Sequence, residues 1–346
     1  MNVSIPIPPL DTLAGAEAQR RQDRLTKPPG ALGKLEALSI RLAAMSGRPD
    51  WLPLRRSIVV CAGDHGVIAQ GVSAYPQEVT RQMVLNFLSG GAAVNVLARQ
   101  MNARVTVVDA GVCGALDPHP NLVQGKIAPG TADFTQGPAM TDAQAEQAIQ
   151  RGIAVARREI DHGLDLLAVG EMGIGNTTSA AAIIAAITGR SAAEVTGRGT
   201  GVDETGLRRK VAAVEAALAR HQPVAQNTLA KVGGFEIGVM AGLMVGAAAQ
   251  RVPVVIDGLI STAAALIAAQ LAPDVTHYLI AGHRSAEPGH RIALEWLGLE
   301  PLLDMGMRLG EGTGALLAFP LIEAAMRTLN EMATFDEAGV SDRNAG

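Results

Sequence analysis

The chain has 346 residues, 48% of them hydrophobic and only 3% aromatic, and its net charge is -4 at pH 7. This length allows one large domain with an appendage or two domains, and the aromatic-poor, Gly- and Ala-rich composition favours packed α/β layers over an all-β sandwich. The weak negative charge gives no basic field for nucleic acid, and no apolar segment approaches the roughly 20 uncharged residues of a membrane span. The N-terminus lacks a signal-like segment. Because Cys61 and Cys113 are expected to be reduced thiols, we expect a cytoplasmic protein.

The first 50 or so residues differ from the rest and are expected to be helical. Asp11 is expected to cap a first helix. The segment TKPPGALGKLE (26–36) breaks that helix and starts a second one that ends near Ser46. Lys27, beside two prolines, is expected to be a solvated turn residue.

Five short apolar segments follow, and each ends in Gly, Asp or His. They are SIVVCAGDHG (57–66), RVTVVDAGV (104–112), DLLAVGEMG (165–173), VPVVIDGLIS (252–261) and THYLIAGHRS (276–285). Helical patterns lie between them, at 76–89, 92–101, 143–162, 178–188, 204–220, 236–250 and 262–271. Strands that are apolar throughout and alternate with helices predict a Rossmann-like parallel sheet with helices on both faces. The carboxyl ends of such strands meet at one edge, where ligands bind in open α/β sheets.

Two further segments lie outside this alternation. Residues 112–141 contain several Gly and Pro residues, so we expect a long irregular excursion that covers a functional site. The chain from Pro288 onward is expected to be helical, with a frayed polar tail after Phe335.

The stretch DLLAVGEMGIGNTTSAAAIIAA (165–186) is the most informative part of the sequence. It predicts a buried strand, a glycine-rich turn and the start of a helix. The first free N–H groups of that helix, together with its dipole, favour an anion, most often a phosphate. The alternative is an ordinary strand-to-helix turn.

Two known phosphate motifs almost match this stretch. The glycine spacing of a P-loop is present, but Asn176 stands where the lysine should be, so NTP hydrolysis is not expected. A G-x-G-x-x-G begins at Gly173, but Thr178 replaces the third glycine, and Glu194 lies in a polar segment rather than after a second strand. A phosphate monoester fits better than a dinucleotide.

Polar side chains recur where the predicted strands end, which indicates a site at that edge of the sheet. They are Asp64, His65, Asp109, Glu171, Asn176, Thr177, Asp257, Ser261, His283, Arg284 and Ser285. A second glycine loop, GRGTGVDE (197–204), precedes a helix that carries Lys210. As an alternative, Asp64 and Asp257 cap the helices after their strands and the histidines are structural. The absence of HExxH, CxxC and EF-hand spacings argues against a metal site, and the absence of G-x-S-x-G argues against a serine hydrolase.

Glu311 has the most specific setting of any carboxylate in the sequence. It lies between glycines in LGEGTG (309–314), and apolar residues flank it on both sides, namely Met305, Met307, Leu309, Leu316 and Leu317. A carboxylate in an apolar wall has a raised pKa, which suits a general base near neutral pH. The alternative is a glutamate that favourably meets a helix dipole.

Six segments taken together resemble one enzyme family. They are AGDHGV (62–67), GEMGIGNTTSAAA (170–182), GRGTGVDE (197–204), DGLISTAAAL (257–266), AGHRSAEPGH (281–290) and LGEGTGALLAFPL (309–321). In this order they resemble nicotinate-nucleotide–dimethylbenzimidazole phosphoribosyltransferases. The resemblance implies transfer of phosphoribose from nicotinate mononucleotide to 5,6-dimethylbenzimidazole, which gives α-ribazole 5′-phosphate and nicotinate for the lower ligand of cobalamin.

The same resemblance implies an organisation and a set of site residues. It implies a large parallel α/β domain (56–299), a small helical domain from both chain ends (1–55 and 300–346), a homodimer, and no cofactor or metal. Glu311 is the implied general base. The implied substrate-binding residues are Glu171, Gly173, Gly175, Asn176, Thr177, Thr178, Gly201, Lys210, Asp257, Ser261, His283, Asp64 and Gln82.

Two other classes of function remain open from the residues alone. One is a nucleotide-dependent oxidoreductase, against which the incomplete dinucleotide motif counts. The other is a nucleotide sensor without catalytic activity. Turnover of nicotinate mononucleotide by the purified protein would exclude a sensor without catalytic activity. If NAD does not change the thermal stability of the protein, a nucleotide-dependent oxidoreductase is excluded.

Overall fold

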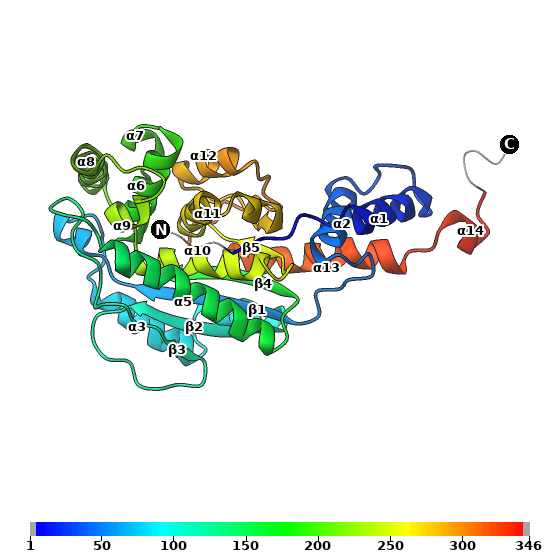
Figure 1. The fold of residues 1–346 in the computed structure, drawn as a ribbon, viewed down its shortest axis with the longest axis horizontal. Coiled ribbons are helices and arrows are strands. Elements are labelled where there is room, and N and C mark those ends of the chain that lie inside the picture. The colour runs from blue at the N-terminus through cyan, green and yellow to red at the C-terminus, as the bar shows by residue number, and fades with distance from the viewer. Residues whose placement is uncertain (1–4, 342–346) are drawn as a thin grey trace.

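The computed structural model describes residues 5–341, and a six-stranded parallel sheet lies at its centre (Figure 1). The strand order is β3-β2-β1-β4-β5-β6. The strands are β1 (Arg56–Gly63), β2 (Ala103–Gly111), β3 (Leu122–Gln124), β4 (Leu166–Met172), β5 (Val254–Ile256) and β6 (Leu279–Ala281). This is the doubly wound order, in which the direction of winding reverses between β1 and β4. The predicted Rossmann-like α/β fold is confirmed.

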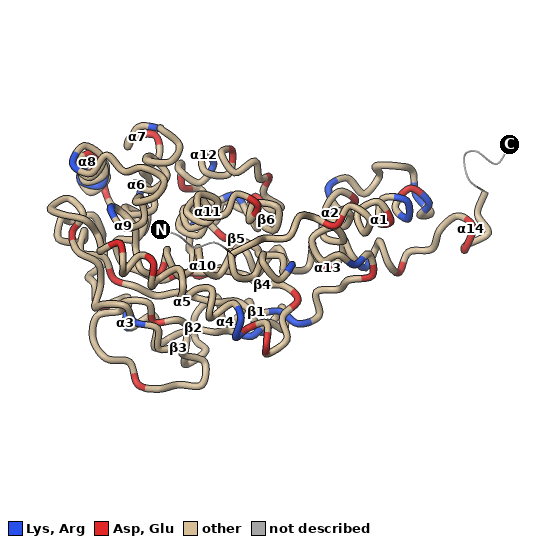
Figure 2. The backbone as a smooth tube through the Cα atoms, viewed as in Figure 1, with Lys and Arg blue, Asp and Glu red and all other residues tan. Residues whose placement is uncertain are grey.

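Helices connect the strands and extend beyond them. They are α1 (Thr12–Arg24), α2 (Lys34–Ser46), α3 (Glu78–Leu88), α4 (Ala93–Gln100), α5 (Asp142–Asp161), α6 (Asn176–Thr188), α7 (Ala192–Val195), α8 (Glu204–His221), α9 (Thr228–Val232), α10 (Phe235–Ala248), α11 (Leu259–Leu271), α12 (Pro288–Leu297), α13 (Thr313–Glu331) and α14 (Phe335–Ala338), with 3-10 turns η1 (Gly66–Gln70) and η2 (Pro273–Tyr278). None of the helices described between residues 5 and 341 is long and apolar enough to cross a membrane. Acidic and basic residues are interspersed along the chain (Figure 2).

Helices cover both faces of the sheet. On one face α10 contacts β1, β2 and β4, and α5 packs against α10. On the other face α4 contacts β2, and α13 contacts α4, β4 and β5. Successive residues of β1 point to opposite layers, so Ile58 lies against Gly312 before α13 whereas Gly63 lies against Glu236 of α10. Both layers are apolar, which explains why the strand segments carry no alternation of polar residues.

The two ends of the chain meet away from the sheet. α1, α2 and α13 contact one another and extend from the sheet (Figure 1). Arg21 of α1 donates hydrogen bonds to the backbone carbonyls of Leu329 (2.7 Å) and Met332 (3.1 Å). The predicted domain bounds stay a prediction, and we propose from these contacts that the described residues of the segments 1–55 and 300–346 form a small helical domain beside the large α/β domain of residues 56–299. The start of α13 nevertheless belongs to the sheet edge, because Gly314 and Ala315 pack against Gly282.

Several local predictions are confirmed and others are wrong. Asp11 caps α1 by accepting from the N–H groups of Leu13 and Ala14. Lys27 is not solvated, because its ammonium lies 2.9 Å from the Glu36 carboxylate and donates to the Gln22 carbonyl. The excursion at 112–141 contains a short strand, β3, which pairs with β2. The region after Pro288 is not continuously helical, since residues 298–312 form an irregular connection between α12 and α13.

Candidate active site

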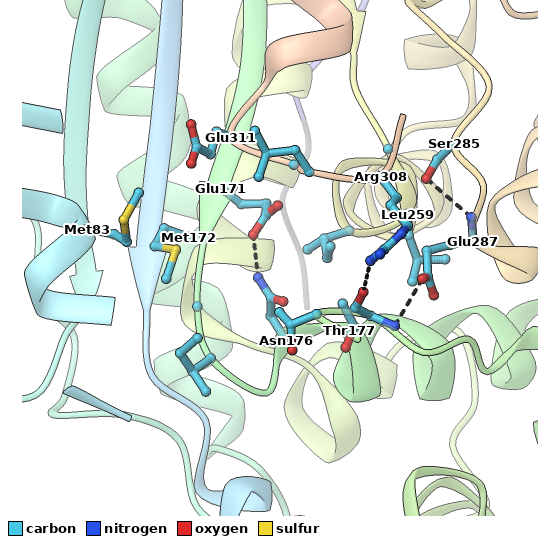
Figure 3. Close-up of a pocket in the computed structure, with 18 of the residues that line it drawn as sticks. Met83, Glu171, Met172, Asn176, Thr177, Leu259, Ser285, Glu287, Arg308 and Glu311 are labelled. Atoms are coloured by element: carbon cyan, nitrogen blue, oxygen red, sulfur yellow. Dashed lines mark hydrogen bonds between the residues drawn. The ribbon is translucent and has the colours of Figure 1, made fainter. Parts of the chain in front are cut away.

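A cavity of about 630 Å³ opens at the carboxyl ends of β4, β5 and β6, beside the point where the winding reverses (Figure 3). Its walls come from five parts of the chain that are distant in sequence. They are the start of α3 and the turn before it, residues 171–177, residues 258–260, residues 283–287 and residues 308–311, with Gly199 and Thr200 at one end. The predicted edge of the sheet therefore carries a set of convergent polar groups.

One end of the cavity is suited to an anion. Asn176 and Thr177 begin α6 there, and Gly175 before them has a left-handed φ of 96° that turns the chain into the helix. The Thr177 hydroxyl lies 2.8 Å from the ammonium of Lys210, which is almost fully buried in α8. Burial lowers the pKa of Lys210 to about 8, although the nearby Glu287 carboxylate opposes that shift. A buried ammonium behind a helix N-terminus is a favourable setting for a phosphate.

The second glycine loop closes over this end of the cavity. Gly199 lies directly over the Lys210–Thr177 pair, because a Cβ at this position would come within 2.8 Å of both side chains. Its N–H donates to the Glu287 carboxylate at 3.0 Å, and its carbonyl accepts from the Arg308 guanidinium at 2.8 Å. These two hydrogen bonds hold the loop in place beside the Lys210–Thr177 pair.

Two carboxylates lie at the other end. Glu171, at the end of β4, accepts a hydrogen bond from the Asn176 amide, and its pKa is raised to about 8. Burial is the main cause of that shift, and repulsion from Asp257, Glu236 and Glu311 adds to it. Figure 3 shows the Glu171 carboxylate directed toward Asn176.

Glu311 occupies the middle of a strained turn. Its φ is 63°, in the left-handed region that glutamate rarely adopts, and Gly310 and Gly312 on either side have φ of 88°. One carboxylate oxygen accepts from the N–H of Val94 at the start of α4, at 3.3 Å. The pKa of Glu311 is raised by burial and by the Asp257 charge, and the Val94 hydrogen bond opposes this rise. The raised pKa agrees in direction with the expectation for a general base.

The apolar wall beside these carboxylates differs from the predicted one. Tyr75, Val79 and Met83 line it from α3 and the turn before it, and Met172 and Leu259 complete it. Of the apolar residues that flank Glu311 in sequence, Leu309 alone lines the cavity. Met305 is exposed and Leu316 lies in the core. The wall is apolar as expected, but other elements supply it.

Comparisons with known proteins place this geometry in a family. A family model described as "Phosphoribosyltransferase" matches residues 7–340. The nicotinate-nucleotide–dimethylbenzimidazole phosphoribosyltransferase of Chloroflexus aurantiacus is 62% identical over 97% of both chains, and that of a Roseiflexus species is 60% identical over 97% of this chain and 96% of its own. The crystal structure of the Thermus thermophilus enzyme of the same name has a TM-score of 0.92 and 52% identity, and the match covers 96% of this chain and 100% of that one.

The chain belongs to the nicotinate-nucleotide–dimethylbenzimidazole phosphoribosyltransferase family. The resemblance noted in the sequence is therefore confirmed, and the chain is an enzyme of this phosphoribosyltransferase family.

Six of the residues that the family resemblance implicates line the cavity. They are Glu171, Gly173, Asn176, Thr177, His283 and Glu311. Lys210 and Thr178 lie just behind them, and Gly175 precedes the first turn of α6. Among residues 5–341, no group of three or more His, Cys, Asp or Glu side chains is placed to hold a metal ion.

The remaining implicated residues of this phosphoribosyltransferase lie elsewhere. Asp257 and Ser261 are buried below the cavity floor, and Asp64 is buried and accepts from the N–H of Cys113 at 2.7 Å. Gly201 belongs to the second glycine loop but is exposed and does not line the cavity. Gln82 is exposed on α3 and does not line the cavity, whereas Val79 and Met83 of the same helix do.

Other residues near the cavity were not predicted from the sequence. Arg308 and Glu287 hold the second glycine loop. Glu287 lies within the segment AGHRSAEPGH (281–290), but the sequence does not indicate that it contacts this loop. His65 and Glu236 form a fully buried pair, 2.7 Å apart, behind Gly173 and Gly175. His65 thus matches the structural alternative considered for it. Nothing in the sequence indicated that Glu236 lies near the site, because it is a single acidic residue at the start of an otherwise apolar helix.

We predict that Lys210→Met raises the KM for the nucleotide about tenfold, because one buried charge that favours the phosphate is lost. The KM of the unmodified enzyme should also rise as the pH increases through about 8, where the ammonium loses its proton. Lys210→Met should lack this pH dependence. Arg209→Met is the matched control, since it removes a positive charge from the exposed neighbour on α8. Equal effects of the two substitutions on KM would contradict the role of Lys210.

Proposed function

We propose that this chain transfers the phosphoribosyl group of nicotinate mononucleotide to 5,6-dimethylbenzimidazole, giving α-ribazole 5′-phosphate and nicotinate for the lower ligand of cobalamin. The observation that carries this proposal is one cavity with an anion-binding end, formed by Thr177, Gly199 and Lys210, and a carboxylate end, formed by Glu171 and Glu311. A nucleotide monophosphate needs the first end, and an attacking base that must lose a proton needs the second.

The proposed chemistry follows from this arrangement. One benzimidazole nitrogen attacks C1′ of the ribose while the bond from C1′ to the nicotinate nitrogen breaks. The other benzimidazole nitrogen loses its proton, which we assign to the carboxylate of Glu311. Nicotinate leaves as a stable aromatic, so no strong general acid is required. Attack from the face opposite nicotinate converts a β-nucleotide into an α-product.

The charges around the cavity support each step. The phosphate is held at the Lys210 end, so its binding energy positions C1′ near the base. Positive charge resides on the pyridinium of the bound nucleotide and develops at C1′ during transfer. Glu171 and Glu311 line the carboxylate end of the cavity and Asp257 lies below its floor, so these three acidic groups stabilise such charge. The wall of Tyr75, Val79 and Met83 suits the flat apolar ring of dimethylbenzimidazole.

The decisive experiment is incubation of the purified protein with nicotinate mononucleotide and dimethylbenzimidazole, followed by mass analysis of the products. We expect α-ribazole 5′-phosphate and nicotinate in equal amounts. Binding of the nucleotide without any turnover would instead favour a sensor. A change in thermal stability with NAD and none with nicotinate mononucleotide would favour a dinucleotide enzyme.

We also propose that the enzyme is a homodimer that acts in the cytoplasm. Tyr75, Met305 and Leu309 are apolar and exposed near the cavity, as is usual for surfaces that another chain covers. The cysteines Cys61 and Cys113 are both free, which fits a reducing compartment. Light scattering at micromolar concentration should give twice the chain mass of 35.7 kDa. A stable and fully active monomer would contradict the dimer.

A further inference from the structure

Asp257 makes an unusual set of contacts below the cavity floor. It follows β5 and is 2% exposed. One carboxylate oxygen, Oδ2, accepts from the N–H of Gly312 at 3.1 Å, and the other, Oδ1, accepts from Gly314 at 2.7 Å and Ala315 at 3.1 Å. Asp257 therefore caps α13, which comes much later in the chain, rather than α11, which follows its own strand.

The segment that Asp257 holds is the one that carries Glu311. Residues 310–312 have three successive left-handed φ angles. This conformation is unfavourable for a non-glycine residue such as Glu311, and it persists only where surrounding contacts over-determine it. Asp257 supplies those contacts on the C-terminal side, and the Thr313 hydroxyl, which donates to the Gly310 carbonyl at 2.8 Å, supplies one within the turn.

We propose that Asp257 is a positioning residue, which acts through the backbone of residues 312–315 to aim the Glu311 carboxylate at the attacking base. It does not line the cavity, so it is not assigned to substrate binding. The His283 ring nitrogen Nε2 lies 3.3 Å from Oδ1 and packs against Gly314, so it braces the same carboxylate from the cavity side. This inference rests on the proposed function, because it gives Asp257 a part in proton transfer by Glu311.

The charge of Asp257 has a second effect. It raises the pKa of both Glu171 and Glu311, so its removal should lower both. Titratable or charged groups face this region from every element packed around it. They are Glu171 at the end of β4, His65 after β1, Glu236 on α10, His283 and Arg284 after β6, His290 on α12, and Arg308 and Glu311 before α13.

The test is Asp257→Asn, assayed with both substrates. The amide keeps one oxygen for Gly314 and Ala315 but presents an NH₂ group to the N–H of Gly312, where Glu311 is attached. We expect kcat to fall roughly 10- to 100-fold, as a small misplacement of a reacting group does, while the nucleotide KM changes less than about threefold. The acid limb of the kcat profile should move to lower pH, which a purely structural defect would not cause.

The matched control is Asp11→Asn. Asp11 caps α1 in the same way, accepting two N–H groups on one oxygen at 3.0 and 2.9 Å, but it lies in the helical extension. It should lower stability without moving the pH profile of kcat. Asp257→Asn with an unchanged kcat, or with an unchanged acid limb, overturns the inference.

Two further outcomes are also decisive. If neither Asp257→Asn nor Asp257→Ser yields a folded protein by circular dichroism, Asp257 is a stability residue and the inference fails. An inactive wild-type enzyme would overturn the proposed function, and this inference with it. An active wild type with an unaffected Asp257→Asn would overturn this inference alone.

Discussion

Glu311→Gln is expected to lower kcat by roughly 10²- to 10⁴-fold, the usual effect of losing a general base. Glutamine keeps the size of the side chain and can still accept from the Val94 N–H, but it cannot take a proton at neutral pH. The nucleotide KM should change little, because the proposed phosphate site, the Thr177–Lys210 pair, lies at the opposite end of the cavity. The measurement is kcat and KM for both substrates, with folding checked by circular dichroism.

Glu171→Gln is the informative counterpart, because it removes a second buried carboxylate from the same cavity. Glu171 is hydrogen-bonded to Asn176, and its pKa of about 8 means that it holds a proton at pH 7 in the empty enzyme. A bound pyridinium cation would favour its ionised form. We therefore expect Glu171→Gln to raise the nucleotide KM more than Glu311→Gln does. Near-wild-type kcat for Glu311→Gln, together with an inactive Glu171→Gln at saturating nucleotide, would show that the two roles are reversed.

The fold was largely predictable because its signals are local. β1, β2 and β4 are mostly apolar, and β4 is followed directly by a helix with a clear start, α6 at Asn176. A sheet that is buried on both faces lacks the alternation of polar and apolar residues seen in a sheet with one exposed face. Apolar segments without such alternation therefore predicted these strands correctly. The short strand β3 escaped prediction because its three residues pair only with β2, inside a segment rich in Gly and Pro.

The candidate site was predictable only where a functional residue lies in a turn whose backbone conformation requires a recognisable local sequence. The glycine turn before Asn176 and the turn around Glu311 need left-handed residues, so the sequence displays them. Arg308, Glu287 and the wall of α3 act through contacts between segments that are distant in the chain, and no spacing encodes those contacts. Lys27 illustrates the same limit, because it is buried and its ion-pair partner, Glu36, belongs to the next helix.

The position of Asp257 at the end of a strand was predicted correctly, but its contacts were not. Its place at the end of a strand suggested either substrate binding or a cap for the following helix. The structure instead joins it to the N–H groups of Gly312, Gly314 and Ala315. That contact depends on how β5 lies beside the start of α13, which only the tertiary arrangement determines.

Gly175→Val is expected to weaken nucleotide binding by roughly 10²-fold or more. Gly175 precedes the first turn of α6 with φ of 96°, and an added Cβ would lie 3.2 Å from the Cβ of His65 and 3.6 Å from Val67. Valine disfavours this backbone conformation strongly, so the turn must shift and move the N–H groups at the helix start. Losing two charge-assisted hydrogen bonds, each worth about 1.5–3 kcal/mol, accounts for this loss of affinity.

Gly189→Val is the matched control, because it lies at the other end of the same helix. Its φ is 71°, and no atom would lie within 4 Å of an added Cβ. Both substitutions therefore impose left-handed strain on α6, but only Gly175 adjoins Asn176 and Thr177, which line the proposed anion-binding end of the cavity. Calorimetry should show weaker nucleotide binding for Gly175→Val alone, with unchanged affinity for dimethylbenzimidazole. Equal loss of affinity for nucleotide and base in a folded Gly175→Val, or equal loss of nucleotide affinity in both variants, would contradict a phosphate site at this turn.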